Sequence, residues 1–150
     1  MKPVVRKTLL PGFLLVLLAL QSNFGNADTR LFGDVELHYS VVNSTFVDPA
    51  IAGRYGIVRA KDRAFLNLAL RRQLPEGGDV AITAKFEGRT WDLLQNQFLN
   101  FREIREGEAI YYIADFEFSN GEIRFFDITL LPEGAEQSDQ FRFQHKVYED

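Results

Sequence analysis

The chain contains no cysteine among its 150 residues, and it contains only two histidines. The absence of cysteine excludes disulfide bonds, a cysteine nucleophile and the lipid-modified cysteine of a lipoprotein. Small exported domains often depend on disulfides, so this chain must be held together by packing and hydrogen bonds alone.

The sequence also has few long apolar runs, and the clearest one lies near its beginning. Three basic residues precede an apolar segment over residues 9–20, and Gly25 and Ala27 supply the small side chains of a cleavage site. This segment is short for a membrane-spanning helix, and the rest of the chain has no second candidate. The pattern predicts a cleaved signal peptide over residues 1–27, with an uncleaved N-terminal anchor as the alternative. We therefore expect export of residues 28–150 to a bacterial periplasm as a single domain.

The expected mature domain is acidic. Residues 1–27 hold three of the 17 basic residues and none of the 21 acidic ones, which leaves 14 against 21 and a net charge of −7. Such a charge argues against nucleic acid as a partner and against general adsorption to anionic lipid. We expect no membrane insertion after signal cleavage.

Polar and apolar residues alternate along most of the domain, as in half-buried β-strands. The pattern predicts a long strand over residues 31–42, a second over 64–72, a third over 80–86 that Gly88 breaks, a further strand over 98–105, and a closing strand over 141–147. With the remaining segments this gives about seven strands and no long helix. The prediction is an antiparallel immunoglobulin-like β-sandwich, with a closed barrel as the alternative. Trp91 is a possible core tryptophan.

The segment around Asn120-Gly121 predicts a β-hairpin. Asn-Gly favours a two-residue type I′ turn, and apolar, aromatic-rich runs flank it on both sides. Pairing outward from this turn sets Glu117 opposite Arg124, an oppositely charged pair. The alternation then shifts by one residue, which predicts a β-bulge at Phe125-Phe126.

Residues 43–61 lack a strand pattern and predict a long crossover loop. Asp48-Pro49 is a helix-start signal, so we expect a single helical turn over residues 50–52 that Gly53 ends. Loops of this length are uncommon in compact domains and often carry function.

Three segments resemble a family of small exported proteobacterial proteins classed as a domain of unknown function, family 4426. These segments are LHYSVVNSTF (37–46), YGIVRAKDRAFLNLALR (55–71) and FREIREGEAIYYIADFEF (101–118). The resemblance covers essentially the whole mature domain. It implies an immunoglobulin-like sandwich in the periplasm, and it implies neither an activity nor any functional residue.

A basic cluster lies in and after the crossover loop. The candidate ligand residues are Tyr55, Arg59, Lys61 and Arg63, and the cluster continues with Arg54, Arg71 and Arg72. Arginine forks suit carboxylates or phosphates, and Tyr55 offers a stacking face, so this pattern predicts a site for a small anionic molecule. The alternative is a solvated strand entrance whose cations pair with nearby acids.

The triplet Asn43-Ser44-Thr45 is a second candidate, because three small hydrogen-bonding side chains at the start of the loop could line a pocket. They could equally satisfy backbone groups where the chain leaves the sheet. The 14 phenylalanines, two of them within residues 1–27, must be mostly core, although they also permit an oily cavity for a small hydrophobe.

Catalytic and metal chemistry has little support. By strand parity His38 points outward and His145 inward, so the two histidines are not expected to form a metal site. Asp115 and Glu117 lie on the polar face of one strand and suit cross-strand ion pairs better than an acid and base couple. We expect no metal, no cofactor and no enzymatic activity.

Two functions remain from this reading. The first is a non-catalytic periplasmic interaction module, to which a partner strand could add along the closing segment, residues 140–148, an expected sheet edge that Lys146 guards. The second is a small anionic-ligand binder that uses the loop from Asn43 to Arg63.

Overall fold

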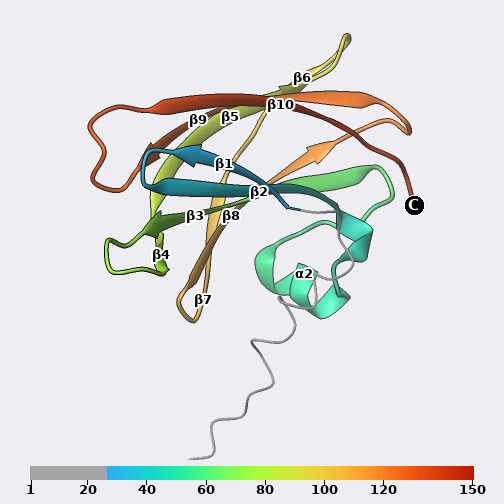
Figure 1. The fold of residues 1–150 in the computed structure, drawn as a ribbon. Helices are drawn as coiled ribbons and strands as arrows, with labels where there is room; N and C mark the ends of the chain where they lie inside the picture. Colours follow the sequence, from blue (N-terminus) through green and yellow to red (C-terminus); the bar gives the residue numbers. More distant parts are fainter. Residues whose placement is uncertain (1–26) are drawn as a thin grey trace, which may run out of the picture.

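A computed structural model describes residues 27–150 as two antiparallel β-sheets that face each other, so the predicted sandwich is confirmed, with ten strands rather than about seven (Figure 1). The predicted signal peptide lies outside the described residues apart from Ala27. No helix within residues 27–150 is long and apolar enough to cross a bilayer.

Six strands form the first sheet, here called sheet A, and four form the second, sheet B. Sheet A has the order β1-β2-β3-β8-β7, and β4 pairs with the end of β3. Its strands are β1 (Asp28–Phe32), β2 (Val35–Asn43), β3 (Arg63–Gln73), β4 (Asp79–Ile82), β7 (Arg102–Glu106) and β8 (Ala109–Glu117). Sheet B has the order β10-β9-β5-β6, with β5 (Ala84–Trp91), β6 (Asn96–Phe98), β9 (Ile123–Pro132) and β10 (Asp139–Lys146).

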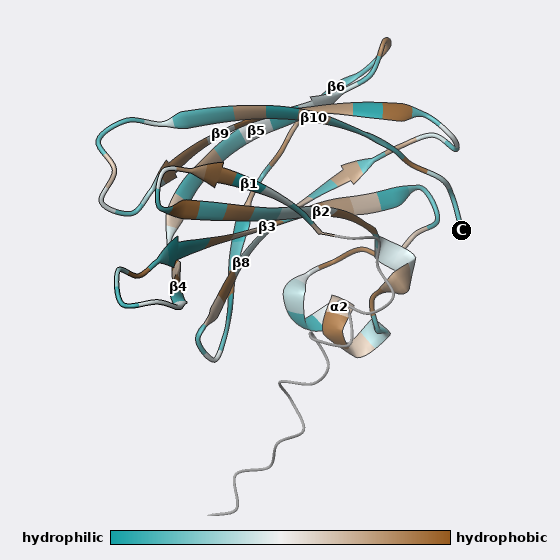
Figure 2. Ribbon diagram, in the orientation of Figure 1, coloured by the Kyte–Doolittle hydropathy of each residue, from teal (hydrophilic) through white to brown (hydrophobic). Residues whose placement is uncertain are grey.

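The main core lies between the two sheets, and the brown bands along the strands in Figure 2 mark its apolar residues. The expected alternation holds for β3 and β9, whose inward positions are buried. Phe116 of sheet A packs edge-on against Phe126 of sheet B, with ring centroids 5.3 Å apart. Burial of each such side chain contributes about 1.5–3 kcal/mol. The fully buried apolar side chains include Leu37, Leu66, Leu68, Leu70, Phe116, Phe126, Ile128 and Leu130.

The predicted hairpin at Asn120-Gly121 is wrong, because β8 and β9 belong to different sheets. Among the described residues only glycines have positive φ, so Asn120 does not adopt the type I′ conformation. Gly121 has a φ of 77°, and the Glu122 N–H donates to the Ser119 carbonyl, as in a type II turn. The chain thereby crosses from one sheet to the other. The bulge at Phe125-Phe126 is also wrong, since β9 pairs without interruption with β5 and β10.

Three predicted strands are each divided in two. A tight turn at Gly33, whose φ is 62°, separates β1 from β2 within the segment 31–42. The segment 80–86 changes sheet between β4 and β5, and the segment 98–105 changes sheet between β6 and β7. Gly88 lies inside β5 rather than ending a strand. Trp91 is not a core residue, because it stacks on Phe125 on the outer face of sheet B.

Among the described residues, one charged side chain is fully buried inside the sandwich. Arg124 is fully buried, and its guanidinium approaches Asp92 and Glu122 at 3.3 Å each and donates to the Thr90 hydroxyl. Its other terminal nitrogen, Nη2, has no hydrogen-bond partner within residues 27–150, although the guanidinium carbon lies 5.9 Å from the centre of the Phe116 ring. This buried ion group joins the start of β9 to the end of β5.

The crossover between β2 and β3 folds over the outer face of sheet A. It contains a short 3₁₀ turn (Ser44–Phe46) and helix α2 (Pro49–Tyr55), which lies below the sheet in Figure 1. Asp48 caps the helix as predicted, but the helix continues through Gly53 and ends at Gly56, whose φ of 66° suits a C-terminal cap. The helix and loop bury a second apolar cluster of Val42, Val47, Ala52, Ile57, Phe65 and Ile113 against the sheet.

Candidate functional site

A groove of about 390 Å³ opens on the outer face of sheet A beside helix α2. Outward side chains of β2, β3, β8 and β7 form its floor, and the crossover forms one wall. The floor includes Ser40, Asn67, Ala69, Tyr111 and Ile104, and the wall includes Val47, Ile51, Tyr55 and Ile57.

The register of the strands determines which side chains meet in the groove. Ser40 pairs with Asn67, and Asn67 pairs with Ile113, so these three outward residues lie in one row across the sheet. His38 and Ala69 form the next row. Because alternate residues of a strand face the same side, all of these side chains face the crossover and not the core.

The groove is apolar with a few hydrogen-bonding groups. Asn67, Ser40 and Tyr111 are half-buried, and none of their side chains forms a hydrogen bond to another residue of the described segment 27–150. Burial raises the pKa of the Tyr111 phenol, and the carboxylate of Glu106 adds to this effect. Tyr111 therefore stays a neutral hydrogen-bond donor at physiological pH. Apolar walls with a small number of placed polar groups are typical of small-molecule sites.

Charged groups around the groove are already paired. Arg71 approaches Asp79 at 2.5 Å, and the Tyr55 hydroxyl donates to Glu106. His38 Nε2 lies 3.1 Å from the Glu36 carboxylate. The groove consequently presents neutral donors and acceptors and no unpaired cation from these residues.

The triplet Asn43-Ser44-Thr45 lies outside the groove and fixes the crossover to the rest of the fold. Asn43 donates to the carbonyl of Tyr148 at 2.8 Å, and the Thr45 hydroxyl contacts the carboxylate of Asp150. Ser44 is buried, and its hydroxyl donates to the Ala60 carbonyl and accepts from the Ala60 N–H. These contacts fit the structural alternative stated above, in which the triplet satisfies backbone groups.

Replacing Ser44 with alanine is expected to lower the free energy of unfolding by about 1–3 kcal/mol, because the partly buried N–H of Ala60 would lose its hydrogen-bond partner and the Ala60 carbonyl would keep only the Arg63 N–H. Urea denaturation of the two proteins measures this difference. Thr45→Ala is the matched control and should change the stability by less than about 0.5 kcal/mol, since Thr45 is partly exposed. Equal effects of the two substitutions would contradict this role of Ser44.

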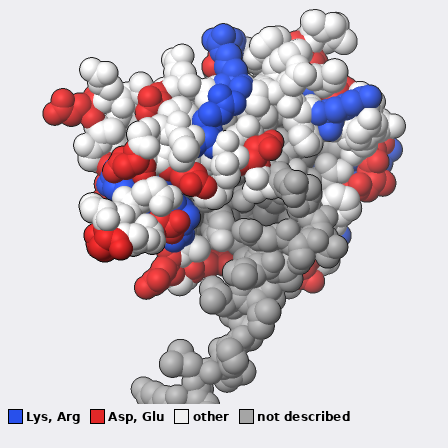
Figure 3. Space-filling model, viewed as in Figure 1, with Lys and Arg blue, Asp and Glu red and all other residues white. Residues whose placement is uncertain are grey.

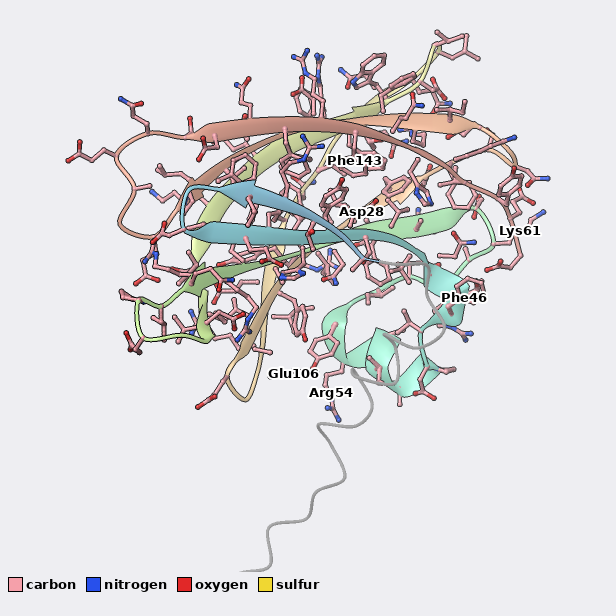
Figure 4. All side chains as sticks on the ribbon, viewed as in Figure 1. Asp28, Phe46, Arg54, Lys61, Glu106 and Phe143 are labelled. Carbon is pink, nitrogen blue, oxygen red and sulfur yellow. The ribbon has the colours of Figure 1, made fainter. Side chains whose placement is uncertain are left out.

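The basic cluster does not gather into one surface. Figure 4 shows Arg54 below α2 and Lys61 well apart from it at the right of the view, where Figure 1 marks the C terminus, and Figure 3 shows basic and acidic side chains interspersed on the visible face. Arg59 donates to the Thr45 carbonyl at 2.8 Å, Lys61 pairs with Glu149 at 3.1 Å, and Arg63 pairs with Glu117. Arg71 and Arg72 lie at the far end of β3, where Arg72 approaches Asp34 at 3.4 Å. Of the predicted ligand residues, only Tyr55 lines the groove.

The remaining polar candidates are also separated. His38 lies on the outer face of sheet A, whereas His145 lies on β10 of sheet B. Asp115 pairs with Arg102 at 2.6 Å, so it forms an ion pair as expected, but Glu117 pairs with Arg63 and not with Arg124. Within residues 27–150 no three histidine, aspartate or glutamate side chains are grouped so as to hold a metal ion.

Sequence reasoning missed Asn67, Tyr111 and Ile104, the floor of the groove. One signal was present, because the run Ala64-Phe65-Leu66 interrupts the alternation with consecutive apolar residues. Such a run is typical of a strand that is covered on both faces. It indicates that the outer face of β3 is covered near Phe65, which is where the crossover packs.

A family model described as "Domain of unknown function (DUF4426)" matches residues 29–150, which confirms the resemblance stated above. The crystal structure of a DUF4426 family protein from Pseudomonas aeruginosa PAO1 is similar to this chain, with 30% identity, a TM-score of 0.71, and coverage of 83% of this chain and 96% of that chain. No curated protein matches.

Two structures of FetP from uropathogenic Escherichia coli strain F11 share the fold. The copper-bound variant is 12% identical with a TM-score of 0.59, covering 82% of this chain and 95% of that one. The as-isolated protein, expressed in the periplasm of E. coli BL21(DE3), is 10% identical with a TM-score of 0.55, covering 82% and 94%. At such identities the likeness shows the fold alone.

Proposed function

For a chain that belongs to DUF4426, a family of unknown function, we propose a non-catalytic role as a periplasmic binding protein for a small, largely apolar molecule. The observation that carries this proposal is the groove between helix α2 and the outer face of sheet A. Its volume of about 390 Å³ lies within the range of small-molecule sites.

The lining of the groove defines the class of ligand. Apolar side chains such as Ile51, Ile57 and Ile104 would cover the body of the molecule, while the amide of Asn67 and the phenol of Tyr111 would bind a polar end. The pairing of Arg71 with Asp79 removes the cation that an anionic ligand would need. This combination favours a neutral ligand over the anionic one that the sequence suggested.

The protein-interaction module remains the second candidate, because β10 is an edge strand of sheet B. Its outer edge offers backbone groups to which a partner strand could add. The groove is the more specific feature, since every antiparallel sandwich has edge strands, whereas loops as long as this crossover are uncommon in compact domains.

Copper binding is not part of this proposal. A variant of FetP, whose fold is similar, has a structure with copper bound. Cys is absent from this chain and its only Met is Met1, so the soft ligands that copper prefers are missing from residues 27–150. The two histidines lie on different sheets, so the described residues do not fit a copper site.

Replacing Ala69 with phenylalanine is expected to weaken ligand binding at least about ten-fold, because the new ring would fill the floor of the groove. Expression of the full chain, recovery from the periplasmic fraction and native mass spectrometry would reveal a co-purifying molecule. The intact mass also gives the N terminus and tests export. Binding of the neutral apolar dye N-phenyl-1-naphthylamine, followed by fluorescence, gives the affinity of each variant.

Thr129→Phe is the matched control, because Thr129 faces outward on sheet B and lies far from the groove. It should bind the dye like the unsubstituted protein. Absence of a co-purifying molecule together with equal dye binding by both variants would overturn the proposed function.

A further inference from the structure

The hairpin between β5 and β6 carries an exposed apolar tip. Leu93 and Leu94 form the turn, and each side chain is 93% exposed. The hairpin projects beyond the sandwich in Figure 1, and its tip is brown in Figure 2. Phe98, on the returning strand, is 78% exposed. Exposed apolar groups gathered in this way mark interaction sites.

The base of the hairpin is held rigidly. Asp92 accepts hydrogen bonds from the backbone N–H groups of Leu94 and Gln95, both at 2.6 Å, which fixes the turn. The same carboxylate approaches the buried Arg124 at 3.3 Å. On β6, the Gln97 side chain donates to the Glu117 carbonyl and accepts from its N–H, so the hairpin is tied to sheet A as well. The leucines are therefore presented in a fixed position.

The outer face of sheet B, from which the hairpin extends, is locally basic. The strand registers place four cations and two carboxylates on this face, namely Lys85, Arg89, Arg142 and Lys146 against Glu87 and Asp127. Arg89 and Arg142 share Asp127, at 3.7 and 3.2 Å. An excess of positive charge here contrasts with the net charge of −7 of residues 28–150. General adsorption to anionic lipid is disfavoured, but this one face is an exception.

Apolar, aromatic and basic groups follow each other in order from the tip inward. Leu93 and Leu94 come first, Trp91 stacks on Phe125 behind them, and Arg89 lies opposite Phe98 one step further back. Side chains that enter a bilayer surface show this order, because leucine reaches the acyl chains, tryptophan prefers the headgroup region and arginine meets lipid phosphates.

We propose that the β5–β6 hairpin docks the protein on the surface of a bilayer containing anionic lipid, with Leu93 and Leu94 inserted and Arg89 and Arg142 at the headgroups. A protein partner is the less favoured occupant. The tip is convex and narrow, whereas a stable protein interface buries about 800 Å² on each partner. Docking is independent of the groove, which lies on the opposite sheet.

Vesicle binding tests the proposal, and Trp91 reports it directly because it is the only tryptophan in the chain. The full chain is expressed so that it can be exported, and all variants are compared with the same N terminus. Vesicles of phosphatidylcholine and phosphatidylglycerol at 3:1 should shift the Trp91 emission to the blue and co-sediment the protein. Combined Leu93→Ser and Leu94→Ser substitutions should reduce the partition coefficient about 30-fold.

The matched control is Leu31→Ser, since Leu31 is 67% exposed on β1 of sheet A and should not affect binding. Arg142→Gln should weaken binding to the mixed vesicles about five-fold and leave binding to pure phosphatidylcholine unchanged. The proposal is overturned if the unsubstituted protein binds neither the mixed vesicles nor those of pure phosphatidylcholine. It is also overturned if the double leucine variant binds as strongly as the unsubstituted protein. The proposal is likewise overturned if the hairpin retains a protein partner and the protein binds no vesicles.

Discussion

Replacing Arg124 with alanine is expected to lower the free energy of unfolding by about 3–5 kcal/mol, the largest effect that we expect from one substitution. The guanidinium is fully buried and lies between the carboxylates of Asp92 and Glu122. Its removal leaves two partly buried negative charges without compensation and opens a cavity beside Phe116. Urea denaturation at pH 7.5 measures the loss. Arg142→Ala, which removes an arginine that is 74% exposed, should cost less than about 1 kcal/mol.

The loss on replacing Arg124 should depend on pH. Burial raises the pKa of Glu122, whereas hydrogen bonds from the backbone of Leu94 and Gln95 lower that of Asp92, and Arg124 lowers both. Without Arg124 both pKa values rise, so the folded variant takes up protons at a higher pH than the folded unsubstituted protein. The destabilisation should therefore be largest at pH 7.5 and shrink as the pH falls towards the ordinary carboxyl pKa of about 4.3. A loss that stays constant across this range would contradict the carboxylate pairing.

Gly88→Ala is expected to destabilise the fold by about 2–3 kcal/mol. A Cβ atom at Gly88 would lie 2.6 Å from Cδ1 of Ile128 and 2.9 Å from the backbone oxygen of Asp127. Ile128 is fully buried in the core, so neither its side chain nor the β9 backbone can move away without loss of packing. Thermal and urea unfolding both measure the effect.

Gly53→Ala is the control for Gly88, and it should have the opposite sign. Gly53 lies within helix α2, where an added Cβ meets no atom within 4 Å. Alanine stabilises an exposed helical position by about 0.5–1 kcal/mol relative to glycine. A Gly88 variant that is as stable as the Gly53 variant would show that β5 and β9 are not packed so closely.

Strand parity could be predicted from the sequence, because it is a local property. The inward positions of β3 and those from Phe126 to Leu130 follow from alternation within one segment. The assignment of strands to sheets could not be predicted in this way. Asn120-Gly121 correctly indicates a turn, but a turn does not determine whether the next strand pairs with the previous one or joins the opposite sheet. Here β9 joins the opposite sheet, and Phe126 packs against Phe116 across the core.

The candidate site shows the same limit. Asn67 and Tyr111 each occupy an ordinary outward position on a strand, and only the order β2-β3-β8-β7 brings them to one groove. The length of the crossover loop and its helix-start signal predict it from the sequence, and this loop forms the wall of the groove. The arginines in and after the loop are close together in the sequence, but each has its own partner. Arg63 pairs with Glu117, which is distant in the sequence, and Arg59 donates to the Thr45 carbonyl. Arginines that are close together in the sequence therefore do not form one charged site in the structure.

The way in which the chain alternates between the sheets sets the order in which it can fold. Sheet A is complete only when β8 has formed, and sheet B only when β10 has formed. Residues near the C terminus then contact the start of the crossover, since Asn43 donates to the Tyr148 carbonyl and Thr45 contacts Asp150. A chain that becomes available for folding from its N terminus would thus lack a stable fold until almost all of its strands are present.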